Sequence, residues 1–206
     1  MLIDVYDFDG TIYDGDSTFD YVKFCLRRHP AMLLGMPRIA AAGLRLAMKK
    51  MGLTQFKSAL FGVMTRYMDL GAEAERFWQD ERTQAKLGAW FKDTPRDLPI
   101  VIASASPEFE LCHAAKILGV TNLIGTRADG ATGRLIGKNC KGEEKVRRIQ
   151  EWLDAQGLSV DKEKSAGYGD SPSDAPMLLL TGSPNLVNPK RKLVKNVPQG
   201  RILHRR

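Results

Sequence analysis

Short apolar runs rich in β-branched residues recur along the chain and predict buried strands. They lie at residues 1–8, 98–106, 165–171 and 184–189, and residues 201–205 predict an edge strand. Amphipathic segments at residues 107–119, 142–157 and 173–182 lie between them and predict helices, each ending in a glycine. Buried strands that alternate with helices indicate a parallel sheet with right-handed crossovers. The sequence therefore predicts an α/β fold with a Rossmann-like core, in which a parallel sheet lies between two layers of helices (three-layer α/β/α).

One long segment interrupts this alternation. Residues 17–92 read as almost entirely helical and separate the first predicted strand from the second. The pattern predicts an α/β core formed by residues 1–16 and 93–206, with an all-helical cap formed by residues 17–92 inserted after the first strand. Because the insertion begins just after a cluster of aspartates, we expect the cap to cover that cluster.

Composition places the chain among globular proteins, with 43% hydrophobic and 27% charged residues. Its formal net charge of +7 arises from the C-terminal segment 190–206, which is rich in Lys and Arg and has no acid, whereas the rest of the chain is balanced. Such a segment either attracts an anionic partner, such as a lipid surface or nucleic acid, or is a solvated terminus without a partner. The sequence contains no zinc finger, helix-turn-helix or aromatic stacking motif, so we expect no nucleic-acid partner.

Three further features bear on where the protein resides. The apolar stretch 31–51 is interrupted by Pro37, Arg38 and Arg45, so it falls short of the roughly 20 apolar residues that a membrane span needs. It is either an interfacial amphipathic helix or a cap helix with a solvated basic stripe. Three widely spaced cysteines without a CxxC pair argue against a disulfide framework and against a thiolate metal site. Because Asp4 stands so near the N-terminus, we expect no signal peptide and a cytoplasmic location.

Polar side chains follow the predicted strands at the points where these end. The sequence places Asp7 and Asp9 after the first strand, Ser104 and Ser106 at the end of the second, Lys141 and Lys145 around a helix start, and Asp170 and Asp174 after the third strand. Ligands of open parallel sheets bind at the carboxyl ends of the strands, so we expect these groups to converge. Carboxylates without His or Cys partners suit Mg²⁺, which also offsets their mutual repulsion. The alternative, a solvated acidic loop, is disfavoured by the ordered combination of motifs.

These motifs carry a family resemblance. DFDGT, the Ser of ASAS, a Lys and GDSPSD resemble, in this order, the motifs of the haloacid dehalogenase superfamily of phosphatases, over essentially the whole chain. The resemblance implies that Asp7 is the nucleophile and forms an aspartyl-phosphate, and that Asp9 is the general acid/base. It also implies that Ser104 binds the phosphoryl oxygens. Mg²⁺ would be bound by Asp7, Asp170 and the backbone carbonyl of Asp9, with Asp174 in support.

The sequence leaves open which lysine binds the phosphate. Lys141 and Lys145 both have a spacing that suits the lysine that stabilises the intermediate, and a Gly-x-x-Lys-Val pattern favours Lys145. Thr11, Ala105 and Ser106 adjoin the motif residues, and we expect them to contact the substrate.

The predicted cap resembles that of the phosphoserine-phosphatase-like branch, which has a helical C1-type cap. In that branch an acid shortly after the nucleophile binds the amino group of phosphoserine, and Asp16 stands at this place. A cap Arg binds the carboxylate, and Leu60 stands at the matching position in an ungapped alignment. Loss of that Arg removes a charge-assisted fork for a carboxylate and argues against phosphoserine.

A second resemblance concerns the substrate. IASASPEFEL, GRLIGKNCKGEEKVRRI and GYGDSPSDAPML are similar to the subfamily that contains bacterial phosphatidylglycerophosphatase C. This similarity implies a phospholipid head group as substrate and peripheral contact with an anionic membrane at its inner face, which the basic cap and tail would suit. The alternatives are a small-molecule phosphatase of the phosphoserine type and a non-catalytic binding module with a basic tail. An intact motif set argues against the binding module, because binding alone does not require Asp9.

Overall fold

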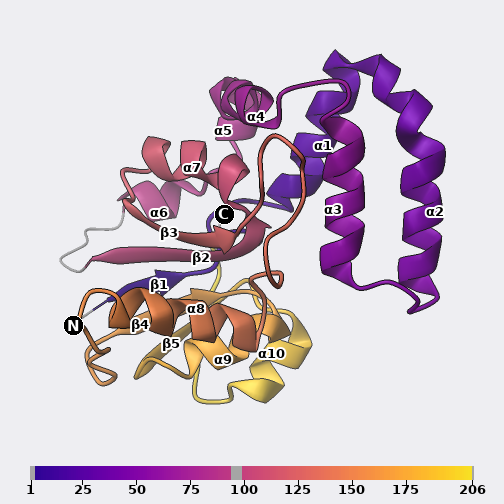
Figure 1. Ribbon diagram of the computed structural model, residues 1–206. Helices are drawn as coiled ribbons and strands as arrows, with labels where there is room; N and C mark the ends of the chain where they lie inside the picture. The colour runs from indigo at the N-terminus through magenta and orange to yellow at the C-terminus, as the bar shows by residue number, and fades with distance from the viewer. Residues whose placement is uncertain (1–2, 94–98, 206) are drawn as a thin grey trace.

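A parallel sheet of six strands lies at the centre of the computed structural model, which describes residues 3–93 and 99–205 (Figure 1). The strands are β1 (Asp4–Tyr6), β2 (Ile100–Pro107), β3 (Asn122–Thr126), β4 (Ala166–Gly169), β5 (Ser183–Val187) and β6 (Arg201–Leu203). Their order is β3-β2-β1-β4-β5-β6, and all neighbours are parallel. The order reverses beside β1, which is where open α/β sheets bind ligands. The predicted fold class is confirmed.

Helices cover both faces of the sheet because the side chains of each strand alternate between them. The helices of the core are α7 (Glu108–Ile117) on one face and α8 (Glu143–Asp154), α9 (Ala175–Leu178) and α10 (Arg191–Asn196) on the other (Figure 1). On β1, Val5 belongs to a buried cluster with Ile149 of α8, whereas Tyr6 belongs to a second cluster with Leu111 of α7. The sheet is thus the middle of three layers.

Helices also fill the segment between β1 and β2. They are α1 (Ser17–Arg28), the 3-10 helix η1 (Pro30–Gly35), α2 (Met36–Ala47), α3 (Leu53–Met64), α4 (Leu70–Gln79), α5 (Glu81–Gln84) and α6 (Ala89–Asp93). The cluster on the α7 face includes Tyr21 of α1, Phe77 of α4 and Phe91 of α6, so much of the insertion shares a core with the sheet. The division into a core and a cap with the predicted boundaries stays a prediction.

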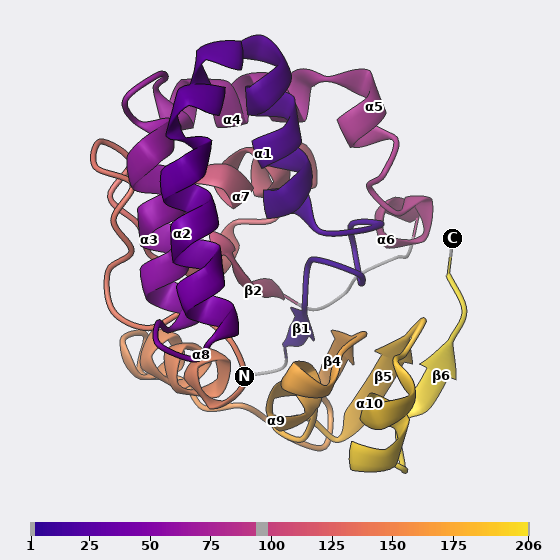
Figure 2. The ribbon, with the colours of Figure 1, turned by 90° about the vertical axis from the view of Figure 1, so that its right-hand side faces the viewer.

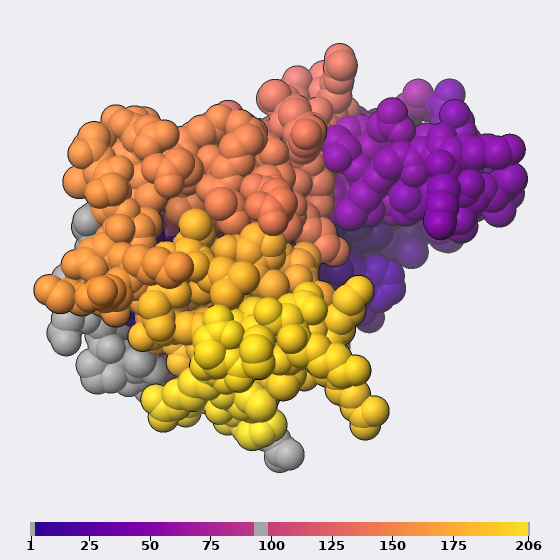
Figure 3. All heavy atoms as spheres, turned by 90° about the horizontal axis from the view of Figure 1, so that it is seen from below, coloured from indigo at the N-terminus to yellow at the C-terminus, as the bar shows by residue number. Residues whose placement is uncertain are grey.

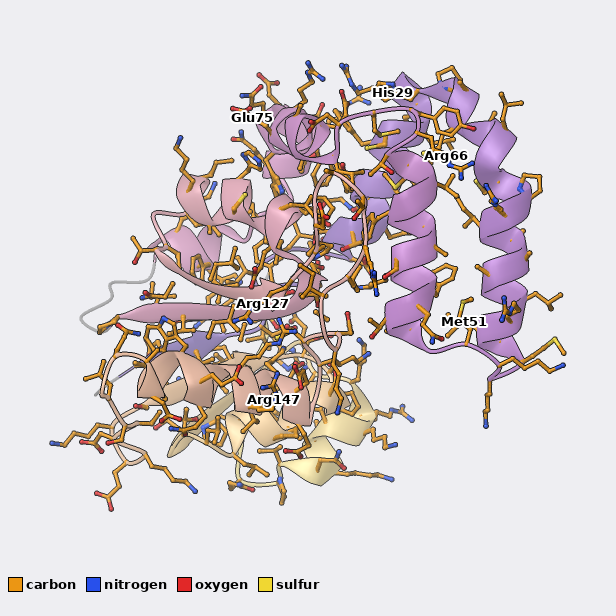
Figure 4. The ribbon with its side chains drawn as sticks, viewed as in Figure 1. His29, Met51, Arg66, Glu75, Arg127 and Arg147 are labelled. Atoms are coloured by element: carbon orange, nitrogen blue, oxygen red, sulfur yellow. The ribbon has the colours of Figure 1, made fainter. Side chains whose placement is uncertain are left out.

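The part of the insertion that stands away from the sheet is the hairpin of α2 and α3 (Figures 1 and 3), whose two helices lie side by side in Figure 2. Met51 marks the turn between these helices, and His29 lies near the opposite end of the hairpin (Figure 4). Ala42 is the buried residue of α2 among those that the structure describes, because α2 packs mainly against α3 and η1. None of the described helices is both long enough and apolar enough to cross a bilayer.

A loop of the core, residues 127–142, holds α3 in place. The backbone N–H of Leu135 donates to Ser58 Oγ at 3.0 Å, and the N–H of Asn139 donates to Thr54 Oγ1 at 3.2 Å. Beyond the Ser58 bond, Gly133 packs against Phe61 in the next part of α3. Gly133 has a φ of +68°, and a Cβ there would lie 2.4 Å from the backbone carbonyl carbon of Phe61. Only glycine fits at such a close approach. α3 is therefore attached to the core at several points along its length.

The sequence pattern missed some elements. It predicts neither β3 nor α10, and α10 and β6 make most of the basic C-terminal segment part of the folded α/β core. The first two residues of the first predicted strand, Leu98 of the second, and Arg206 of the basic segment lie outside the described residues.

Candidate active site

Three buried aspartates meet at the carboxyl edge of the sheet. Asp7 follows β1, and its N–H donates to the carbonyl of Tyr168 in β4 at 2.8 Å, which brings it beside Asp170. Asp7, Asp170 and Asp174 each offer a carboxylate oxygen, and these oxygens all lie within 4.8 Å of one another. A glycine permits this close approach, since a Cβ on Gly10 (φ +80°) would lie 2.6 Å from Asp170 Oδ2.

Lys145 neutralises part of this charge. Its Nζ, which is almost completely buried, lies 2.8 Å from Asp7 Oδ1 and 2.8 Å from Asp174 Oδ1. Burial opposes the charge on the ammonium, but the two carboxylates raise the pKa of Lys145. Burial is also the largest influence on Asp174, yet Lys145 and Ser171 hold the pKa of Asp174 below its ordinary value.

Lys145 does not fully offset the negative charge around Asp7. Burial, followed by the charge of Asp174, raises the pKa of Asp7 to about 8 in spite of Lys145. Burial likewise raises the pKa of Asp170, although Lys190 forms an ion pair with its Oδ2 at 3.1 Å. A cluster of hard oxygen donors with too little positive charge fits Mg²⁺. The Asp9 carboxylate is not in this cluster of described residues, and its partners are Ser17 and Ser106 instead.

Both carboxylate oxygens of Asp9 are held in place. The N–H of Ser17, at the start of α1, lies 2.6 Å from Asp9 Oδ1, and the hydroxyl of Ser106 donates to Oδ2 at 2.6 Å. Burial raises the pKa of Asp9, and these two hydrogen bonds counteract part of that rise. A raised pKa favours the protonated form, so an aspartate of this kind is suited to hold and transfer a proton.

A chain of hydrogen bonds continues from Ser106 into the interior. Ser106 Oγ lies 3.0 Å from Thr18 Oγ1, which lies 2.9 Å from Oε2 of the fully buried Glu110 in α7. Burial and the charge of Asp9 raise the pKa of Glu110 to about 8. Each hydroxyl has one proton to donate. If Ser106 donates to Asp9 and Thr18 donates to Ser106, Glu110 must supply the proton between itself and Thr18.

The predicted phosphate-binding residues differ in their access to the site. Ala105 and Ser106 line the cavity at the site, whereas Ser104 is fully buried and its Oγ accepts a hydrogen bond from the N–H of Ser106 at 3.1 Å. Thr11 is buried, and its hydroxyl has no partner among the described residues. Lys141 lines the cavity from an exposed position, while Lys145 contacts Asp7. The geometry favours Ser106 over Ser104 as the hydroxyl nearest a ligand, and all these roles stay predictions.

The cavity extends from the aspartates to the inserted helices and has a volume of about 880 Å³. Asp16 lies at its edge and caps α1 by accepting a hydrogen bond from the N–H of Phe19 at 2.8 Å. Leu60 contributes to the wall, but its neighbours Phe61 and Met64 are fully buried in the core and are not among the residues that line the cavity. Most of the wall contributed by the inserted helices is apolar, with Val22, Leu26, Met36, Ile39, Phe56 and Leu60.

Sequence reasoning missed three residues near this site. Lys57 of α3 lines the cavity, Lys190 pairs with Asp170, and Glu110 lies behind Ser106. A signal for Lys57 was present, since it is the single charged residue of the apolar helix α3. Lys190 directly follows a predicted strand and so belongs to the same sheet edge. Glu110 has no signal in the sequence, because its burial depends on long-range packing.

Comparisons with known proteins identify a family model, related sequences and a shared fold. A family model described as haloacid dehalogenase-like hydrolase matches residues 5–179. Protein CicA of Caulobacter vibrioides is 31% identical over 192 residues, which are 87% of this chain and 82% of that protein. Histidinol-phosphatase of Neisseria meningitidis is 33% identical over 105 residues, 48% of this chain, and the match spans only 47% of that relative's length. The crystal structure of a probable phosphoserine phosphatase from Vibrio cholerae shares the fold, with a TM-score of 0.68 and 12% identity over 94% of this chain and 58% of that one.

Proposed function

The chain belongs to the haloacid dehalogenase-like hydrolases, and on this basis we propose that it is a Mg²⁺-dependent phosphatase that acts through an aspartyl-phosphate. One observation supports the proposal above all others. Carboxylate oxygens of Asp7, Asp170 and Asp174 lie within 4.8 Å of one another at the carboxyl edge of the sheet, and the buried Lys145 ammonium contacts Asp7 and Asp174. A binding module would not require Asp9 to be held by both of its oxygens beside this cluster.

In the proposed reaction, Asp7 attacks the phosphorus atom of a phosphomonoester. Lys145 binds Asp7 Oδ1, which leaves Oδ2 for the attack and places a positive charge beside the transferred phosphoryl group. Asp9 donates its proton to the leaving alcohol and then takes a proton from the water that hydrolyses the aspartyl-phosphate. The raised pKa of Asp9 supports the first of these roles.

The metal would be held by Asp7, Asp170 and, by family resemblance, the backbone carbonyl of Asp9, with Asp174 in support. When bound, Mg²⁺ supplies positive charge that offsets the repulsion between the Asp7 carboxylate and the phosphate. Lys190, on the exposed side of Asp170, adds a further positive charge at this edge.

Hydrolysis of p-nitrophenyl phosphate tests the proposal. We expect turnover with Mg²⁺, loss of turnover with EDTA, and no turnover by Asp7→Asn. Asp129→Asn is a suitable control, because Asp129 is in the loop 127–142 and does not line the cavity. Turnover that survives both chelation and Asp7→Asn would refute the mechanism.

The apolar wall of the cavity favours a substrate with an apolar portion. Each Å² of apolar surface that such a substrate buries there contributes roughly 25 cal/mol. Phosphoserine would gain little from this wall. We therefore propose a phosphate ester of a lipid, such as phosphatidylglycerophosphate, as the substrate class. The alternative is a small phosphorylated metabolite, which the name of the matched histidinol-phosphatase favours. A kcat/KM for phosphoserine more than tenfold above that for a short-chain phosphatidylglycerophosphate would contradict the lipid assignment.

The surface of η1 and α2 supports contact with an anionic membrane. Leu33, Leu34, Leu44 and Met48 are 56%, 80%, 62% and 52% exposed. The exposed Arg38, Arg45 and Lys49 lie among them, and each basic residue near an anionic leaflet contributes about 1 kcal/mol. Such contact would place the protein at the inner face of the membrane.

Vesicle sedimentation tests this contact. We expect the protein to bind vesicles of phosphatidylglycerol and phosphatidylcholine more strongly than phosphatidylcholine alone. Leu34→Glu should weaken that binding, whereas Leu179→Glu, which alters an exposed leucine after α9, should not. Equal binding by both variants and by the wild type would count against the proposal.

A further inference from the structure

Lys57 is a partly buried cation that has no role in the proposed reaction. It extends from α3 into the cavity, and its Nζ donates to the carbonyl of Ala105 at 2.9 Å. No carboxylate forms an ion pair with it among the described residues. An ammonium in shielded surroundings without a directly paired carboxylate is unfavourable. Burial lowers the pKa of Lys57, although the charges of Glu110, Asp9 and Asp16 counteract part of this effect.

The hydrogen bond to Ala105 does not explain why a lysine stands here. Thr126 Oγ1 already donates to the same carbonyl at 2.8 Å, so that carbonyl would stay satisfied without Lys57. The ammonium has further N–H donors besides the one that it uses. Because Lys57 lines the cavity, these donors are available to a ligand.

The other lysines of the cavity differ from Lys57 in their partners. Lys145 is held by two carboxylates, Lys190 pairs with Asp170, and Lys23 pairs with Asp20 at 2.5 Å. Lys141 is exposed, so water solvates it. Among the described lysines that line the cavity, Lys57 therefore combines shielding from solvent with the absence of an ion pair.

The position of Lys57 determines which part of a substrate it can reach. It belongs to α3 of the inserted helices, whereas Asp7 follows β1 of the sheet (Figure 1). Its partner Ala105 directly precedes Ser106, which contacts Asp9. Lys57 is thus near the residue that would protonate the leaving alcohol.

We infer that Lys57 forms an anion subsite that binds a second negatively charged oxygen group, carried by the alcohol part of the substrate close to the phosphate ester. This inference rests on the proposed phosphatase function and specifies its substrate class. A carboxylate and a phosphodiester both carry negatively charged oxygens that can accept hydrogen bonds from the Lys57 ammonium. Because this ammonium is shielded from water, the ion pair would be stronger than on an exposed surface. Leu60 occupies the place of the expected arginine on the same helix, and Lys57 supplies a cation from a different turn.

Calorimetric dissociation constants measured with Mg²⁺ test the inference without requiring turnover. The ligands are glycerol 3-phosphate, in which the alcohol is neutral, 3-phosphoglycerate, which carries a carboxylate at nearly the same size, and glycerophosphoglycerol phosphate, which carries a phosphodiester. Asp7→Asn serves as the common background, so that no ligand is hydrolysed. We expect at least one of the two anionic ligands to bind tenfold or more tightly than glycerol 3-phosphate. The carboxylate as the favoured ligand points to a small metabolite, and the phosphodiester points to a lipid head group.

When Lys57→Met is combined with Asp7→Asn, the preference for the anionic ligand over glycerol 3-phosphate should be lost. Lys57→Arg in the same background should retain most of this preference. Lys23→Met is the matched control, because it removes a cavity lysine that already has a carboxylate partner, and it should leave the preference unchanged. Weaker binding of all three ligands by the same factor in Lys57→Met would show that Lys57 only attaches α3 to the core, and would overturn the inference. The inference would also be overturned if the Asp7→Asn protein bound neither anionic ligand more tightly than glycerol 3-phosphate. Hydrolysis of p-nitrophenyl phosphate, measured separately, decides the proposed function.

Discussion

Replacement of the buried Glu110 by glutamine should make the protein more stable at alkaline pH. The pKa of Glu110 is about 8 in the folded protein, compared with about 4.5 for an ordinary glutamate. Between these values the folded chain retains a proton that the unfolded chain has released. Stability then falls as pH rises, and the fall ends above about pH 8, where both states have lost the proton. Glutamine stays neutral throughout this range and removes the penalty, and its amide group can keep the hydrogen bond with Thr18 Oγ1.

The magnitude follows from the size of the shift. Each pH unit within the window costs up to about 1.4 kcal/mol, because one pKa unit corresponds to 1.36 kcal/mol. From pH 5 to pH 8 the penalty from Glu110 reaches at most about 4 kcal/mol. This is a large share of the roughly 5–15 kcal/mol that stabilises a typical domain. The full penalty applies, because Glu110 is completely buried and solvent screens it little.

Urea denaturation at pH 5, 6, 7 and 8 measures the effect. The difference in unfolding free energy between Glu110→Gln and the wild type should rise in favour of the variant at each step. Other groups with shifted pKa values are common to both proteins and cancel in the difference. Glu75→Gln, an exposed change on α4 that points outward (Figure 4), should show no such trend. Parallel pH curves for the wild type and Glu110→Gln would refute the proton assignment along the Thr18–Ser106 chain.

Three further predictions concern the site and its support. Asp9→Asn should lower kcat for p-nitrophenyl phosphate by ~10²–10⁴, as loss of a general acid/base does, and a wild-type kcat would exclude Asp9 from the mechanism. Lys145→Ala should reduce kcat more than Lys141→Ala, because Lys145 contacts Asp7 and Lys141 is exposed; the reverse ranking would transfer the role to Lys141. Gly133→Ala should destabilise the fold by about 1–3 kcal/mol through overpacking against α3, and an unchanged urea midpoint would contradict the close approach.

The alternation of strands and helices could be predicted from the sequence, because parallel strands that are buried on both faces form continuous apolar runs. β1, β2, β4 and β5 were predicted on this basis, whereas β6 was predicted as an edge strand. β3 was not predicted, because its sequence, NLIGT, begins with Asn and contains a glycine, which are both unfavourable in strands. Pairing with the neighbouring strand, rather than local propensity, determines its conformation. α10 escaped because a run of basic residues resembles a solvated terminus.

The candidate site was predictable where chemistry depends on spacing along the chain. The positions of Asp7 and Asp170 follow from the ends of strands that pair with each other. Which lysine contacts Asp7 could not be decided from spacing, because the loop before α8 sets the helix position. The lining of the cavity was predicted incompletely, since helix faces in the insertion are assigned by packing. Phe61 and Met64 turn inward, whereas Lys57 reaches the cavity.

The unequal support of the two helices of the hairpin has a consequence for the rate of the reaction. α3 is attached to the loop 127–142, whereas α2 packs mainly against α3 and η1. Elements with few buried contacts open locally at the lowest free-energy cost, so α2 should exchange its amide hydrogens faster than α3. A bulky product would then leave by displacement of this one helix while the catalytic groups keep their geometry. If this departure limits the cycle, kcat will fall as solvent viscosity rises, although the chemical step itself does not depend on viscosity.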